Sequence, residues 1–137
     1  RSGYLFRFDP SKHSVKVLKR LTSEPSKRTG MFDKSEYGYL GLVLGADGHT
    51  LYYLTGAPLS DSDKNSKKDA DQKEGADLVT YDISSGKYVD HGRIMFDNGD
   101  PVSPAQSLVM GLDGTLYTLS YVVEDGKSGI DLISFHP

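Results

Sequence analysis

Two short phrases recur along this 137-residue chain, and their recurrence constrains the fold more than any other feature. Residues 42–52 read LVLGADGHTLY, and residues 108–117 read LVMGLDGTLY. A second phrase, with apolar residues at its first, second and fourth positions, occurs at 5–9, 78–82 and 132–136. Phrases that alternate at long period predict stacked copies of one structural unit, each burying its apolar faces against its neighbours.

The two phrases predict β-strands joined by tight turns. Asp-Gly in the first phrase tolerates the positive φ of a hairpin turn, and Pro10 presets the backbone of the turn at 9–12. The 15 glycines and nine tyrosines suit short aromatic strands separated by turns. The expected strands are 3–8, 14–20, 39–45, 50–56, 77–82, 87–94, 105–111, 115–122 and 130–136.

The order of these strands predicts an all-β fold of antiparallel four-stranded units. Residues 1–38 supply the third and fourth strands of one unit and a long loop, residues 39–94 supply one complete unit, and residues 95–137 supply the first three strands of another. Four-stranded antiparallel units in series are typical of β-propeller blades. A two-sheet sandwich is the structural alternative, and the interleaved repeat argues against it.

The residues of the hairpin phrase carry a family resemblance. GADGHTLY at 45–52 resembles the PDG-x-x-LY phrase of YVTN, TolB-like and SMP-30-like propeller blades, although neither copy has Pro before the Asp. The resemblance implies a β-propeller. At roughly 15 residues per strand, a ring of six to eight blades needs on the order of 360 to 490 residues. We therefore expect about two and a quarter blades of a larger ring, with strand edges covered by the remainder of the propeller or by other copies.

Loop lengths predict which face of these blades is functional. The connections at 21–38, 57–76, 95–104 and 123–129 are long and lie at one end of the blades, whereas the hairpin turns at the other end are short. Long loops carry function more often than closure requires, so a ligand site is expected at the long-loop end. His13 and His49 fall in the short turns, where an imidazole is expected to be a surface or turn residue.

The candidate site residues are of the binding type. Arg28 and Arg93 suit a carboxylate through bidentate contacts, Tyr37 can stack on a sugar ring, and Gln106 follows on the same rim. These residues predict a ligand-binding face for carbohydrate or another anionic ligand. A protein-interaction scaffold that uses the same face is a further alternative, and a solvated surface loop is the plainer one.

A weaker resemblance connects the outline to propeller polysaccharide lyases. That resemblance implies β-elimination on uronate-containing glycans, with His91 and Tyr37 as catalytic residues beside Arg28 and Arg93. No lyase motif is matched, and one propeller fold hosts many chemistries. Whether the chain is an enzyme is therefore left open. For the propeller segment with a binding face, we expect a bacterial exported protein, periplasmic or extracellular, with a cytoplasmic one as the alternative.

No cofactor or metal is expected. Asp61, Asp63 and Asn65 match the first positions of a calcium loop, but its sixth position is Ser66 instead of Gly and its twelfth is Gln72 instead of Glu. With no cysteine, the sequence excludes disulfides and thiolate sites. The 16 basic and 19 acidic residues do not favour nucleic acid as a partner, and no apolar stretch is long enough to span a membrane.

Overall fold

The computed structural model describes residues 3–24, 41–55, 75–102, 107–124 and 126–137, and within them the chain is all-β. The strands of this part are β1 (Tyr4–Asp9), β2 (Ser14–Arg20), β3 (Leu42–Leu44), β4 (Thr50–Thr55), β5 (Asp77–Asp82), β6 (Tyr88–Arg93), β7 (Val109–Met110), β8 (Leu116–Glu124) and β9 (Lys127–Phe135). They form three antiparallel sheets of two, four and three strands, each in chain order. The predicted all-β antiparallel class is thereby confirmed.

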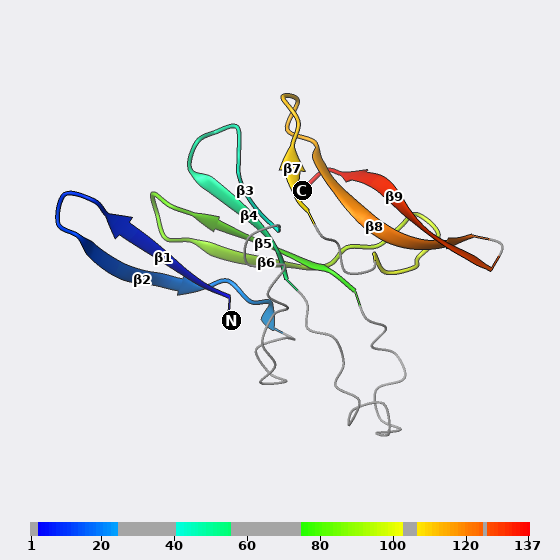
Figure 1. The fold of residues 1–137 in the computed structure, drawn as a ribbon, viewed down its shortest axis with the longest axis horizontal. Helices are drawn as coiled ribbons and strands as arrows, with labels where there is room; N and C mark the ends of the chain where they lie inside the picture. Colours follow the sequence, from blue (N-terminus) through cyan, green and yellow to red (C-terminus); the bar gives the residue numbers. More distant parts are fainter. Residues whose placement is uncertain (1–2, 25–40, 56–74, 103–106, 125) are drawn as a thin grey trace, which may run out of the picture.

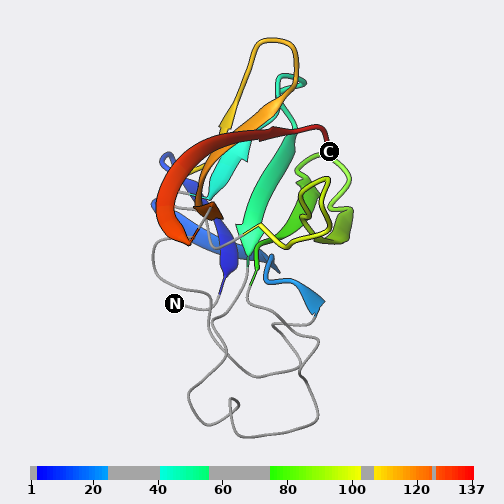
Figure 2. The ribbon, with the colours of Figure 1, turned by 90° about the vertical axis from the view of Figure 1, so that its right-hand side faces the viewer.

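The three sheets stand side by side, with β1–β2 at one end, β3–β6 in the middle and β7–β9 at the other end (Figure 1). We call them the first, middle and third sheets. The β3–β4 and β7–β8 turns lie at the same end of the molecule (Figure 1). Figure 2 shows the third sheet curving in front of the middle one, so the sheets are layered face to face.

The middle sheet is buried on both faces because its side chains alternate between two apolar clusters. Leu54 and Leu78 point toward the third sheet, where they pack with Leu116. Val79 and Tyr81 point the other way and pack against the first sheet. This alternation is the physical reason why the second phrase keeps apolar residues at adjacent positions: each of its first two residues belongs to a different interface.

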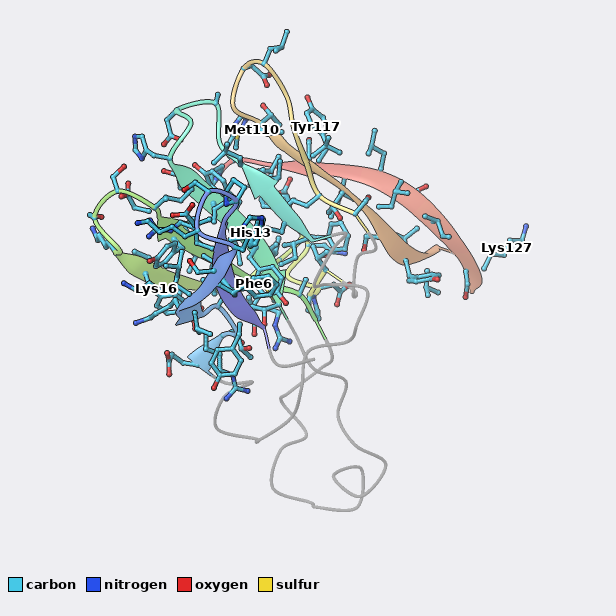
Figure 3. All side chains as sticks on the ribbon, turned by 60° about the vertical axis from the view of Figure 1, so that its left-hand side comes forward. Phe6, His13, Lys16, Met110, Tyr117 and Lys127 are labelled. Atoms are coloured by element: carbon cyan, nitrogen blue, oxygen red, sulfur yellow. The ribbon has the colours of Figure 1, made fainter. Side chains whose placement is uncertain are left out.

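The first phrase encodes a hairpin in which a tyrosine lies against a glycine. A Cβ at Gly45 would lie 3.0 Å from the Tyr52 ring, and a Cβ at Gly111 would lie 3.0 Å from the Tyr117 ring. The two copies meet in space, since the Ala46 amide donates a hydrogen bond to the sulfur of Met110 at 3.2 Å. Met110 and Tyr117 lie together at the β7–β8 hairpin (Figure 3).

The segment 123–129, expected as a long loop, is a strand hairpin instead. β8 and β9 pair along their whole length, from Leu116 opposite Phe135 to Glu124 opposite Lys127. Gly126, with φ of 72°, allows the chain to reverse there within a tight turn. The prediction of a long loop at this position was wrong, and the third sheet extends further than the sequence indicated.

The described part of the predicted loop 95–104 also returns to the sheet. Met95 and Pro101 form an isolated bridge, and Gly99, with φ of 84°, lies in the turn between them. Val102 then donates its amide to Ile94 and accepts from Ala76, each at 2.9 Å. This segment therefore closes the long-loop end of β5 and β6 instead of projecting from it.

His13 is strained because it occupies a position that the repeat otherwise gives to glycine. Its φ is 46°, and Gly86, at the matching place in the β5–β6 turn, has φ of 73°. Left-handed backbone costs a non-glycine residue roughly 1–2 kcal/mol, against roughly 0.5–1 kcal/mol for the extra chain entropy of glycine. We expect His13→Gly to raise the free energy of unfolding by about 0.5 kcal/mol in urea denaturation. Gly86→His should lower it, and two changes of the same sign would contradict this account.

Candidate functional site

The short-turn end of the sheets is organised by aspartates that accept hydrogen bonds from their own turns. Asp9 Oδ1 accepts from the Ser11 amide at 3.0 Å, and Asp82 Oδ1 accepts from the Ser85 amide at 2.6 Å. Asp47 Oδ1 accepts from the Thr50 amide at 2.9 Å. Asp113 does the same in the last copy, where it accepts from Thr115 at 3.0 Å. These aspartates fix turns, so the recurring Asp of both phrases has a structural role.

One imidazole joins two of these turns. His49 Nδ1 lies 2.7 Å from Asp82 Oδ2, and its Nε2 lies 3.6 Å from Asp47 Oδ2. The Ile83 amide also donates to the His49 carbonyl at 2.8 Å. In the third sheet, His136 follows β9 at the place of Asp82, and hydrogen bonds from the Thr115 amide and hydroxyl lower the pKa of Asp113. These contacts of His49 with the two aspartates explain it as a structural residue.

The turn hydrogen bonds lower the pKa values of these carboxyl groups. The Thr50 hydroxyl and amide, with the His49 amide, lower the pKa of Asp47 to about 2 from its ordinary value of 3.8. Hydrogen bonds from the Ser85 amide and hydroxyl lower the pKa of Asp82. Because the folded-state pKa is the lower one, the unfolded chain binds protons more readily in acid, and this stabilisation is lost as the pH falls.

The pH dependence of stability should therefore have a component from Asp47. Its stabilising effect is complete above the ordinary pKa of 3.8 and disappears as the pH falls toward about 2. We expect Asp47→Asn to flatten the fall of the thermal midpoint between these two pH values, while the wild type loses stability more steeply. Asp131→Asn, which removes an exposed carboxylate of β9, is the control. Parallel curves for wild type and Asp47→Asn would contradict the prediction.

The opposite end of the sheets holds a buried polar network. Asp77, the first residue of β5, has a side chain that is only 3% exposed. Its Oδ1 accepts from Arg93 Nε at 2.7 Å, and its Oδ2 accepts from the Ser23 hydroxyl at 2.8 Å. The Ser23 amide in turn donates to Thr55 Oγ1 at 3.2 Å. A buried carboxylate is tolerated here because both of its oxygens are hydrogen-bonded.

This network connects the first sheet to the middle one. The segment 22–24 leaves β2 and crosses the end of the middle sheet, where the Tyr88 hydroxyl donates to the Thr22 carbonyl at 3.0 Å. The Glu24 amide donates to Asp90 Oδ2 at 2.7 Å. The long-loop end is thus braced by side chains, whereas the short-turn end is braced by local turns.

Arg93 is held in a narrow space at the surface of the network. A Cβ at Gly75 would lie 2.6 Å from Arg93 Cδ, so only glycine leaves room for the arginine stem. The Arg93 side chain is 31% exposed, and its guanidinium therefore reaches solvent while Asp77 stays buried. A guanidinium that is partly exposed and fixed by a buried carboxylate is preorganised for a planar anionic group.

His91 lies on a β-bulge that belongs to the repeat. Leu78 pairs with Gly92 and Val79 pairs with Asp90, so His91 is the additional residue on β6. The first sheet has the same irregularity at the matching place, where Leu18 is the additional residue of β2. His91 Nε2 lies 2.9 Å from the Thr80 hydroxyl. Because both copies have the bulge, its presence is a property of the architecture and does not by itself mark a site.

Two of the predicted site residues lie in the described part of the chain, and they have different partners. Arg93 bonds to Asp77, and His91 bonds to Thr80. The other predicted residues, Arg28, Tyr37 and Gln106, and the weighed calcium positions Asp61, Asp63 and Asn65, lie outside the described residues. Whether Arg28, Tyr37 or Gln106 joins Arg93 stays a prediction.

Sequence reasoning missed Asp77, Ser23 and Thr55. The available signal was an acidic residue between Ala76 and Leu78, directly before the apolar pair Leu78 and Val79. A charged group in such a place needs a partner, and Arg93 stands directly opposite it in the antiparallel register.

Comparison with protein-family models, with curated proteins and with solved structures finds no match for this chain. Among the residues that the structure describes, His, Asp and Glu side chains do not gather in groups of three that could hold a metal ion. The same residues contain no helix long and apolar enough to cross a membrane.

Proposed function

We propose that this chain is a segment of a β-propeller that presents a ligand-binding face at the long-loop end of its sheets. Three face-to-face antiparallel sheets that share the second phrase, with the first phrase in two of them and the bulge in two, support the propeller assignment. The observation that carries the binding face is the buried network of Ser23, Asp77 and Arg93 at that end. The rest of a ring, in one polypeptide or several, would then cover the open strand edges.

The ligand class that suits this end is an anionic carbohydrate. Arg93 offers a fixed guanidinium, which binds carboxylates through paired hydrogen bonds. Arg28 and Tyr37 belong to a connection that the sequence assigns to the same end, and Gln106 lies at the start of the predicted strand 105–111, so they are the residues expected to extend the site. Recognition of such a glycan suits an exported protein, and the proposal needs neither nucleic acid nor a membrane.

We prefer a binding function over a catalytic one because of the hydrogen-bond partners of His91 and Arg93, the two candidate residues that the structure describes. A β-elimination needs a base aimed at the proton beside a neutralised carboxylate. His91 is engaged by Thr80 on the bulge, and Arg93 is engaged by Asp77. Arg93 therefore supports recognition of an anion, whereas the hydrogen-bond partner of His91 within the described ranges is Thr80, a hydroxyl of the neighbouring strand.

The proposal is tested by titration with uronate oligosaccharides and their neutral counterparts. We expect galacturonate oligomers to bind, neutral galactose oligomers to bind at least tenfold more weakly, and hydrogen exchange to slow at 75–77 and 91–102. Arg93→Lys keeps the ion pair with Asp77 but loses the planar fork, so it should weaken binding about tenfold. Arg7→Lys, on β1 near the short-turn end, is the matched control.

Two results would reject the binding face. One is equal affinity for charged and neutral oligomers, and the other is protection confined to the short turns at 46–49 and 83–86. Formation of an unsaturated product from a uronate polymer, measured by its ultraviolet absorbance, would instead show that the protein acts as a polysaccharide lyase.

A further inference from the structure

The third sheet has an apolar outer face that is exposed. Two of its inward side chains, Leu116 and Thr118, are 0% exposed because they face the middle sheet. The outward positions of β8 and β9 carry no charged side chain in the residues that the structure describes. The exposed apolar residues of this face are Val109 (56%), Leu119 (43%), Tyr121 (48%), Val123 (72%), Ile130 (58%) and Leu132 (67%).

The repeat shows that this kind of face is normally covered by another sheet. Leu119 occupies the place of Leu54, which is 0% exposed in the middle sheet. Leu132 occupies the place of Leu78, which is 4% exposed. Leu54 and Leu78 are buried because the third sheet lies on them. The outer face of the third sheet therefore repeats a surface whose other copy is a sheet-to-sheet interface.

The first sheet also exposes an apolar face, and it is the counterpart of the outer face of the third sheet. Phe6 occupies the place of Val79 and Phe8 the place of Tyr81, which are 0% and 6% exposed in the middle sheet. Phe6 and Phe8 are 62% and 54% exposed, because they project from the side of β1 that faces away from the middle sheet. Val15 and Val17 stand opposite them on β2, and with Tyr4 they complete an apolar face. Figure 3 views the molecule from this side, with Phe6 labelled.

These two faces are the two halves of an interface that the molecule already contains. Between the middle and third sheets, Leu54 and Leu78 meet Ile133 and Phe135. In the repeat, Ile133 and Phe135 occupy the places of Phe6 and Phe8. The outer face of the third sheet is therefore equivalent to the face of the middle sheet that carries Leu54 and Leu78. The outer face of the first sheet is equivalent to the inner face of the third sheet, which carries Ile133 and Phe135.

We propose that the outer face of the third sheet binds the outer face of the first sheet of a second copy of this chain, in a head-to-tail contact. The contact continues the stacking of the three sheets from one copy to the next. It buries large apolar side chains that monomeric proteins rarely expose in contiguous patches. Because the two faces differ, the contact is heterologous and leaves one face of each kind available for another copy. The proposal rests on the stacked repeat and is independent of the ligand.

Two charged variants test the contact by sedimentation velocity over a range of concentrations. We expect the wild type to increase in mass with concentration, and Phe6→Asp and Leu132→Asp to remain monomeric at concentrations where the wild type associates. Lys87→Asp, an exposed change outside both faces, should associate like the wild type. Circular dichroism of each variant establishes that it is folded.

Mixing the two variants identifies the geometry. Phe6→Asp retains the outer face of the third sheet, and Leu132→Asp retains that of the first sheet, so an equimolar mixture should form a 1:1 dimer that grows no further. Three outcomes would overturn the proposal: a wild type that is monomeric throughout, association of Phe6→Asp with itself, or a mixture that stays monomeric. The first would mean that another partner covers these faces, and the second would indicate a symmetric contact between third sheets.

Discussion

Replacing Arg93 by glutamine is expected to lower the free energy of unfolding by about 3–5 kcal/mol, because it leaves a charged carboxylate buried without its partner. Asp77 is 3% exposed, so water cannot replace the lost Nε hydrogen bond of 2.7 Å. The Ser23 hydroxyl would remain as a donor, but it supplies one hydrogen bond and no positive charge. Urea denaturation at neutral pH measures the loss.

Replacing the other partner of the ion pair, Asp77, should lower the free energy of unfolding by less. The comparison of the two single variants is the control. Asp77→Asn keeps an oxygen that can accept from Arg93, and the arginine is 31% exposed and can be hydrated. We expect a loss of about 1.5–3 kcal/mol, the usual range for a hydrogen bond to a charged group. The double variant should be less destabilised than the sum of the two single ones. Additive losses would show that the ion pair does not couple the two residues.

Stability at this end bears on the ligand site because both depend on the same arginine. Arg93→Gln would remove the guanidinium and also disturb the braced segment 22–24, so a loss of binding in that variant has two causes. Arg93→Lys separates them, because the lysine retains a positive charge beside Asp77. A functional effect of Arg93→Lys without a large fall in stability would therefore support direct contact with an anion.

Local signals in the sequence predicted most strand positions correctly. Strand β5 was predicted at 77–82 and is found at Asp77–Asp82. The reason is that alternation, Asp-Gly turns and short hairpin connections are all encoded within a few residues. The all-β antiparallel class followed from the same local features, and it did not depend on contacts between sheets.

Features that depend on distant residues were not predictable. Ser23 and Asp77 are 54 positions apart, and only the stacking of the first sheet on the middle one brings them together. The hairpin at 123–129 was missed for another reason: most of its residues are polar or glycine and resemble a loop, although Val122 and Val123 pair with Gly129 and Ser128. The Asp-Gly dipeptide at 125–126 was in fact the same turn signal as at 47–48.

The repeat also contains two leucines at the same place, one buried and one exposed, whose replacement should have different costs. Leu54 is 0% exposed between the middle and third sheets, whereas Leu119, at the same place in the next copy, is 43% exposed. Leu54→Ala should lower the free energy of unfolding by about 2–5 kcal/mol, because it removes buried methyl groups and leaves a cavity against Leu78 and Leu116. Chemical denaturation at low protein concentration measures it on the single chain.

Leu119→Ala is the matched control, since it makes the same chemical change at the same place in the repeat. With almost half of its side chain already in water, it should cost less than about 1 kcal/mol at low concentration. At high concentration the same variant should weaken head-to-tail association, because Leu119 then takes the buried role of Leu54. Equal losses for the two variants in dilute solution would mean that the outer face of the third sheet is already covered within one chain, and that would contradict both the layering and the docking surface.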